Sequence, residues 1–404
     1  MSTLRPETDV ASLSGDLVVR TRRGGYLDIL GFFRVVAFAC VVGQHSFLWT
    51  GMANNVPGTA FITVLHFTRD AFFFLSALVV CYAQITRPRR LWSFWKRRYL
   101  QMGVPYLAWT LIYVVFTILR PGGTWSHFGS YLWSDLWLGY YQLYVVVVLF
   151  QLYLVVPLLL RLLRSTRHHV AVMAVSLAFA AFLGIVLHYH SHLGPVTHAM
   201  NWMNHWVPWS RDILSYQEFF VAGALMAFHL DRVLAFLERQ HRQILWVSGA
   251  LGGVTVLWYY VAIWSGASTG SASDIYQPIA FVWSFAAIAG ILSLSWSWQQ
   301  RRLFPQTGAR RRWPITFLAE LSGGVYLSHV LFINMIRAWL EGLGWRDHMP
   351  WPAVVIVLYV GTLACALPFV ALIKRSPLRW VLGGPFRVAQ RTEADAGIAL
   401  PATT

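Results

Sequence analysis

Residues 27–49 read LDILGFFRVVAFACVVGQHSFLW, an apolar run that carries Arg34 in its first half and His45 near its end. A helix that crosses a bilayer needs about 20 mainly apolar residues, so this run is long enough. With about 3.6 residues per turn, a spacing of eleven places both side chains on one helix face, about 16 Å apart along the axis. An ionisable residue there opposes insertion by roughly 2.5–3.5 kcal/mol and usually serves a function. The alternative is structural: Arg34 pairs with a distant carboxylate and His45 donates to a backbone carbonyl.

The composition places the chain among proteins that cross the membrane many times. Hydrophobic residues make up 57% of its 404 residues and charged residues 12%. The apolar runs predict an all-α fold with about ten transmembrane helices and no appended soluble domain. The predicted spans are 27–49, 61–85, 99–119, 138–160, 170–188, 212–230, 243–264, 276–297, 316–340 and 352–373.

The distribution of basic residues predicts the orientation of these helices. The formal charge is +16, and all but six of the 32 Lys and Arg residues fall in tails and loops on one side of the predicted membrane. This asymmetry is typical of cytoplasmic loops, so both termini are predicted to be cytoplasmic. Residues 1–26 are expected to be a disordered tail, 27–373 the membrane domain and 374–404 a second tail. The pattern argues against nucleic-acid binding, although basic loops attract anionic membrane lipids or a phosphorylated cosubstrate.

The cysteines and the loop histidines do not predict a metal site. Cys40, Cys81 and Cys365 all lie in predicted spans, where small apolar fillers are the simplest interpretation. The loop at 189–211 contains histidines whose spacing matches no compact zinc motif, so we interpret them as residues of an outer surface. These histidines are His190, His192, His198 and His205.

Polar side chains also interrupt other predicted spans near the level of His45. Arg69 and Asp70 open the second span; because adjacent residues do not face each other on a helix, we expect one of them to contact another helix. The alternative is that this pair only marks the membrane boundary. Helices turn polar faces toward one another or toward a wet cavity, which predicts a shared substrate cavity. Its other candidate residues are Tyr141, Gln142, Glu218 (a candidate partner for an intramembrane Arg), Tyr326 and His329.

A basic and aromatic segment lies at the cytoplasmic entry to the third span. Arg97 and Arg98 follow Trp95 and Lys96 there. Arginine can bind phosphates in a bidentate manner, and cations stack on flat aromatic rings, so the segment is a candidate site for the phosphorylated end of a cosubstrate. The alternative is an ordinary positive-inside anchor with an interfacial tryptophan.

Five segments, in this order, resemble the membrane acyltransferase-3 family, including its polysaccharide-modifying branch. The segments are Arg34 to His45, which matches an Arg-x10-His pattern, Arg69 to Ser76, Trp92 to Tyr106, Gly139 to Pro157, and Leu321 to His329. The resemblance covers roughly residues 30–375. One departure is Ala77, which stands where the family usually has glycine after Leu-Ser.

The resemblance implies a multi-pass plasma-membrane enzyme that takes its acyl group from cytoplasmic acyl-CoA, most commonly acetyl-CoA. The implied acceptor is a hydroxyl of a cell-envelope glycan or glycolipid at the outer face. Arg34 and the basic loops then guide the donor, and His45 takes the proton of the attacking hydroxyl. An acyl-histidine intermediate is the alternative. Gln44, Tyr326 and His329 are candidate oxyanion donors.

Two functions from other classes remain open on the sequence alone. A transporter or flippase for a lipid-linked sugar would also need about ten spans, a polar cavity and basic loops. Such proteins often contain repeated halves with broken helices at matching positions, and no such pairing is visible here. A sensor or structural partner of an envelope complex is disfavoured, because a buried Arg and His stripe is costly unless it is used.

Overall fold

The chain was analysed as a computed structural model that describes residues 9–50, 55–189, 204, 208–303, 314–345 and 348–383, with side chains from residue 29 onward. The described residues form helices and no strand. The helices are α1 (Asp9–Leu48), α2 (Val56–Leu65), α3 (Phe67–Thr86), α4 (Leu91–Ile118), α5 (Phe128–Leu138), α6 (Tyr144–Leu162), α7 (Arg167–Tyr189), α9 (Gln217–Phe228), α10 (Leu230–Trp264), α11 (Thr269–Ala272), α12 (Pro278–Leu303), α13 (Pro314–Gly342) and α14 (Trp351–Arg375).

The predicted all-α, multi-pass membrane fold is confirmed. Within the described ranges, nine helical segments are long and apolar enough to cross a membrane. The sixth predicted span, 212–230, is the exception, because its helix α9 has only 12 residues and ends before α10 begins at Leu230. Its first residues form a turn instead: the carboxylate of Asp212 accepts hydrogen bonds from the backbone N–H groups of Leu214 and Ser215 at 2.7 and 3.0 Å. This side-chain capping competes with helix formation.

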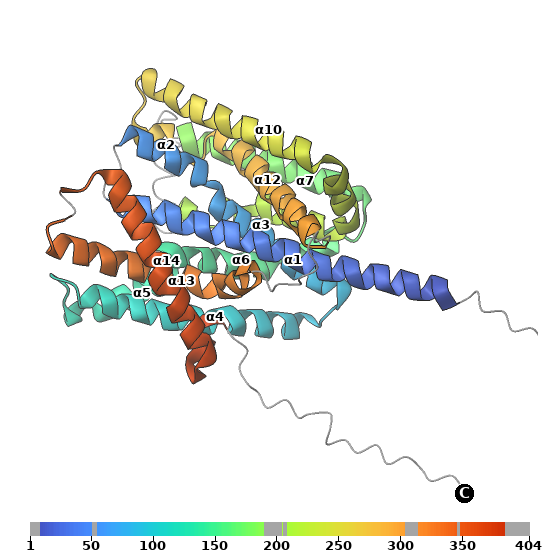
Figure 1. The fold of residues 1–404 in the computed structure, drawn as a ribbon, viewed down its shortest axis with the longest axis horizontal. Helices are drawn as coiled ribbons and strands as arrows, with labels where there is room; N and C mark the ends of the chain where they lie inside the picture. The colour runs from blue at the N-terminus through green and yellow to red at the C-terminus, as the bar shows by residue number, and fades with distance from the viewer. Residues whose placement is uncertain are drawn as a thin grey trace, which may run out of the picture.

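Both predicted tails contribute more structure than the sequence suggested. Helix α1 begins at Asp9, so residues 9–26 of the expected disordered tail are helical, and no proline after Pro6 interrupts that stretch. This part of α1 extends beyond the rest of the bundle (Figure 1). After α14, the short 3₁₀ helix η6 (Pro377–Leu382) turns back onto α4, where Trp109 Nε1 donates to the carbonyl of Val381 at 3.1 Å. The loop histidines 190, 192, 198 and 205 lie outside the described residues.

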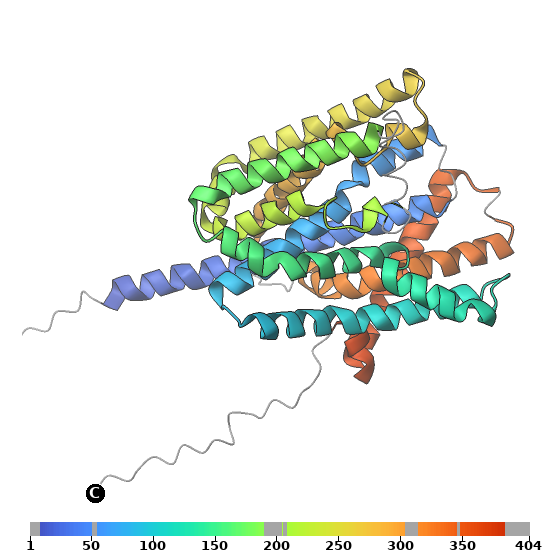
Figure 2. The same ribbon diagram turned by 180° about the vertical axis from the view of Figure 1, so that it is seen from behind.

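Helix α3 is at the centre of the bundle. In the segment α2–α3, 67% of the most apolar stretch is buried, against 11% in α7 and 17% in α10. The core around α3 contains residues of α1, α6, α9 and α12, while α10 and α4 lie at opposite edges in both views (Figures 1 and 2). Outward side chains such as Leu372, at 68% exposure, and Trp246, at 81%, are apolar. Large apolar patches of this kind suit a lipid environment.

Helices α3 and α9 form the most extensive helix pair among the described residues, and their backbones approach closely at one position. A Cβ atom on Gly223 of α9 would overlap the carbonyl oxygen of Phe74 on α3. The backbones therefore meet at a position where only glycine fits, and small residues are the usual means of packing membrane helices tightly.

Substitution of Gly223 tests this contact. We expect Gly223→Ala to reduce stability by about 1–3 kcal/mol, because the new methyl group forces α3 and α9 apart. The control is Gly253→Ala on the exposed side of α10, where an added Cβ meets nothing within 4 Å. The thermal midpoint of the detergent-purified protein provides the measurement. Equal midpoints for the two variants would contradict the close α3–α9 packing.

Candidate active site

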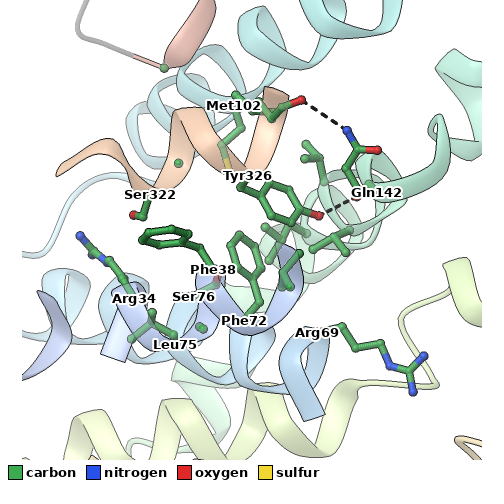
Figure 3. Close-up of a pocket in the computed structure, with 18 of the residues that line it drawn as sticks. Arg34, Phe38, Arg69, Phe72, Leu75, Ser76, Met102, Gln142, Ser322 and Tyr326 are labelled. Carbon is green, nitrogen blue, oxygen red and sulfur yellow. Dashed lines mark hydrogen bonds between the residues drawn. The ribbon is translucent and has the colours of Figure 1, made fainter. Parts of the chain in front are cut away.

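A cavity of about 490 Å³ runs through the bundle between α1, α3, α4, α6 and α13, with η6 at one end. Arg34, Arg98 and Glu320 line the part near the basic ends of these helices, and Gln44 and His45 line the part eleven residues further along α1. Figure 3 shows Phe72 and Tyr326 between Arg34 and Gln142. We call this space the central cavity. Its wall is mainly apolar between the two polar parts.

The ring of His45 on α1 contacts His329 on α13. His45 Nδ1 lies 2.7 Å from His329 Nε2, and the ring centroids are 4.9 Å apart with the planes inclined by 13°. His329 is fully buried, whereas His45 lines the central cavity. The edge of the Tyr141 ring contacts His45 at a centroid distance of 5.0 Å. The structure therefore brings together three residues that the sequence analysis singled out separately.

The hydrogen-bond partners of the pair fix the tautomers of two neutral imidazoles. His329 Nδ1 lies 2.7 Å from the carbonyl oxygen of Tyr326. Because a carbonyl only accepts, His329 Nδ1 carries the hydrogen and its Nε2 is an acceptor. His45 Nδ1 must then donate to His329, which leaves the lone pair of His45 on Nε2. In this arrangement His45 is oriented as a proton acceptor, and the backbone of α13 holds it there through His329.

The turn before α6 is attached to α13 by a buried polar network. Gln142 Nε2 donates to the Tyr113 hydroxyl at 2.7 Å, and that hydroxyl donates to the carbonyl of Leu327 at 2.8 Å. The Tyr326 hydroxyl donates to the backbone carbonyl of Gln142 at 2.6 Å (Figure 3). Tyr141 has a φ of +34°, unusual for a residue other than glycine, and stands in this turn. The network places Tyr141 against His45, although Tyr141 does not line the central cavity.

Arg69 and Asp70 form an ion pair, contrary to the expectation that neighbours on a helix stay apart. Arg69 Nε lies 3.3 Å from Asp70 Oδ1, because the long arginine side chain folds back at the start of α3. Asp70 Oδ2 also accepts a hydrogen bond of 2.6 Å from Ser284 on α12, so the expected contact with another helix exists as well. The guanidinium of Arg69 lies over the Tyr216 ring at 5.6 Å and points away from Tyr326 and Phe72 (Figure 3).

Glu218 lies in a separate cavity, where the intramembrane arginine that shares its wall is Arg69. This second cavity, of about 210 Å³, is lined by Arg69, Asp70 and Glu218 together with residues of α7 and α12. Glu218 is 3% exposed, and its Oε2 has no hydrogen-bond partner among the described residues. Arg69 lines both cavities, so it marks the wall between them.

The two arginines of the basic segment differ in position. Arg98 lines the central cavity, whereas Arg97 is exposed and is absent from its wall. Trp95, two residues before Arg97, donates a hydrogen bond from Nε1 to the carbonyl of Tyr153 at 3.0 Å. This bond attaches the start of α4 to α6. The sequence pattern alone does not tell which of two adjacent arginines faces the cavity. That depends on which side of α4 packs against α6.

Several cavity residues were not singled out by the sequence. Thr68 Oγ1 donates to Gln44 Oε1 at 2.9 Å, so Gln44 is oriented by a neighbour on α3. Tyr144, Gln101 and Ser322 also line the central cavity. Tyr144 belongs to the predicted segment from Gly139 to Pro157, whose polar residues near the outer end were expected at the cavity. Ser322 lies within the segment from Leu321 to His329, and Gln101 has no such signal in the sequence.

Substitutions at Asp70 and Ser284 test how much the Arg69–Asp70 ion pair stabilises the protein. We expect Asp70→Ala to destabilise the protein by about 3–5 kcal/mol, because it leaves the largely buried charge of Arg69 without its partner. Ser284→Ala removes one hydrogen bond to the same carboxylate and is expected to lower stability by about 1 kcal/mol. Thermal or denaturant unfolding in detergent measures both. A Ser284→Ala effect as large as that of Asp70→Ala would contradict the importance of the ion pair.

Comparison with known proteins identifies the family of the chain. Residues 26–371 match the family model of an acyltransferase domain, acyltransferase family 3. No curated protein and no solved structure matches the chain. The matched region includes the residues of both cavities from α1 to α13. Since the match covers most of the sequence, the chain belongs to the acyltransferase-3 family of membrane acyltransferases.

Proposed function

We propose that this membrane acyltransferase moves an acyl group, most simply acetyl, from cytoplasmic acyl-CoA to a hydroxyl of an envelope glycan or glycolipid at the outer face of the plasma membrane. The observation that carries the proposal is the central cavity itself. It joins two arginines, Arg34 and Arg98, to an oriented imidazole, His45, within one continuous space. An elongated anionic donor requires cationic groups at one end of its site, and the reacting hydroxyl requires a proton acceptor at the other end.

The arginine end suits the phosphorylated part of the donor. Charge-assisted hydrogen bonds from guanidinium groups are among the strongest that bind phosphate. The wall between the arginines and His45 contains Phe38, Phe72 and Leu75, which can contact an uncharged pantetheine arm. The distance of about 16 Å between Arg34 and His45 along α1 suits an extended thioester arm rather than a compact substrate.

The histidine end suits the transfer step. In the proposed reaction, His45 Nε2 takes the proton of the acceptor hydroxyl as its oxygen bonds to the thioester carbonyl carbon. The tetrahedral intermediate then expels the CoA sulfur, and the proton passes from His45 to this thiolate. The products are an ester and CoA with a free thiol. His329 acts as a positioning residue, because its hydrogen bond holds the His45 tautomer that exposes Nε2.

The geometry favours Gln44 among the candidate oxyanion donors. The hydroxyl proton of Tyr326 is directed to Gln142, and the Nδ1 proton of His329 is directed to the carbonyl of Tyr326. Gln44 accepts from Thr68 through Oε1, so its amide nitrogen supplies the donor in the cavity wall. Such a fixed donor stabilises the charge that develops on the thioester oxygen.

Two histidine variants test the catalytic assignment. We expect His45→Ala to lower kcat for transfer from labelled acetyl-CoA by about 10²–10⁴-fold, because the proton acceptor is lost. His329→Ala is expected to lower kcat by roughly 10–100-fold while leaving KM for acetyl-CoA unchanged, because it only disorients His45. The assay uses reconstituted protein and an envelope extract as acceptor. Unchanged transfer in His45→Ala would move catalysis to another residue, and wild-type protein that uses no acyl-CoA would favour transport.

Neighbouring arginines test the donor site. We expect Arg98→Ala to raise KM for acyl-CoA about tenfold or more, since a hydrogen bond to a charged group contributes roughly 1.5–3 kcal/mol. Arg97→Ala removes the same charge one position outside the cavity wall and is expected to have a smaller effect. Arg34→Lys should retain more activity than Arg34→Ala, because lysine keeps the positive charge. It should retain less than the wild type, because lysine cannot bind phosphate in a bidentate manner. A larger KM change in Arg97→Ala than in Arg98→Ala would contradict donor binding in the central cavity.

A further inference from the structure

The second cavity contains polar atoms that the protein itself does not satisfy. Glu218 Oε2 is buried without a hydrogen-bond partner among the described residues, and the hydroxyls of Ser215 and Tyr276, which lie near each other in the same wall, form no well-aligned hydrogen bond. A buried polar group left unsatisfied destabilises a fold by about 1–3 kcal/mol, and more if it is charged. One unpaired carboxyl oxygen beside two hydroxyls whose nearest partners are each other indicates a site for a ligand with hydroxyl groups of its own.

The charged groups of the second cavity favour a ligand with hydroxyl groups over one with an ammonium group. Arg69 is already paired with Asp70, so the acidic group of this cavity that still needs a partner is Glu218. A hydroxyl group can donate to a carboxylate oxygen or accept from a carboxyl O–H, whereas an ammonium group can only donate. The ammonium group is disfavoured because the guanidinium of Arg69 lines the same cavity. A neutral ligand with several hydroxyls fits both conditions.

The volume and the apolar wall of the second cavity further limit the class of ligand. The cavity of about 210 Å³ corresponds to roughly seven water molecules, which is space for one sugar ring rather than an oligosaccharide. Tyr216, Phe219 and Phe281 supply aromatic surface beside the polar groups. A sugar ring has the matching combination, with an apolar face of C–H groups and hydroxyls around its edge.

We infer that the second cavity binds a single sugar ring, with one hydroxyl donating to Glu218 Oε2 and others bonded to Ser215 and Tyr276. The inference rests on the proposed function only for its source, which is then a ring of the acceptor glycan or glycolipid other than the ring whose hydroxyl reacts at His45. Arg69 separates this site from the donor arm in the central cavity. The site thus accounts for a buried carboxylate that the transfer step does not use.

Binding is tested directly, without acyl transfer. The probes are the methyl glycosides of glucose, galactose, mannose and N-acetylglucosamine at millimolar concentration, with the full chain in a detergent that contains no sugar. We expect at least one probe to raise the thermal midpoint of the wild type in a saturable manner, as ligand linkage requires. Glu218→Leu is expected to lose this rise and to show an equal or higher midpoint without ligand, because it removes an unsatisfied buried group.

A matched pair of variants on α7 locates the site. Ala180→Phe places a ring into the second cavity and should abolish the glycoside effect. Ala174→Phe makes the same change on the exposed side of α7 and should retain it. No saturable rise with any probe, or a full rise in Glu218→Leu or Ala180→Phe, overturns the inference. Glycoside binding without any use of acyl-CoA overturns the proposed transfer instead, and acyl-CoA use without glycoside binding overturns only the sugar site.

Discussion

A hydrogen bond of 2.7 Å between His45 and His329 joins α1 to α13 across 284 positions of sequence. Its geometry depends on the rest of the bundle, because each imidazole must find a partner inside a largely apolar interior. The carbonyl of Tyr326 fixes the hydrogen on His329, and His329 in turn fixes the hydrogen on His45. The same turn of α13 accepts bonds from the network around Gln142 and Tyr113. Changing one of these contacts therefore alters the orientation of a side chain on a different helix.

The central position of α3 explains how two cavities adjoin. Its first turn contains Arg69 and Asp70, which contact α12 through Ser284 and lie beside the second cavity. Phe72, Leu75 and Ser76 on the following turns line the central cavity. The close contact with α9 at Gly223 brings Glu218, five residues earlier, to the level of Arg69. One helix thus supplies walls to both spaces, and the division between them is the side chain of Arg69.

The polar groups of the interior are of two kinds. Gln142 Nε2, Asp70 and the paired histidines have partners within the protein, and they hold helices together. Glu218 lies in a cavity wall with an unpaired oxygen. Hydrogen bonds within a buried network make a structure specific, and an unpaired group in a cavity wall can take its partner from a ligand. An unpaired oxygen in the wall of a cavity that the transfer step does not use, rather than burial alone, makes Glu218 a candidate binding residue.

The sequence by itself determined the all-α membrane fold, because about 20 apolar residues in a row have few other stable environments. It also placed Arg34 and His45 on one face, since helical periodicity is local, and it supported the family through segments in order. Tertiary structure alone decided that α9 is short, that Arg98 lines the cavity while Arg97 does not, and that Glu218 belongs to a second cavity. These outcomes depend on which helix faces meet, and residues far apart in sequence set those contacts. No local pattern contains that information.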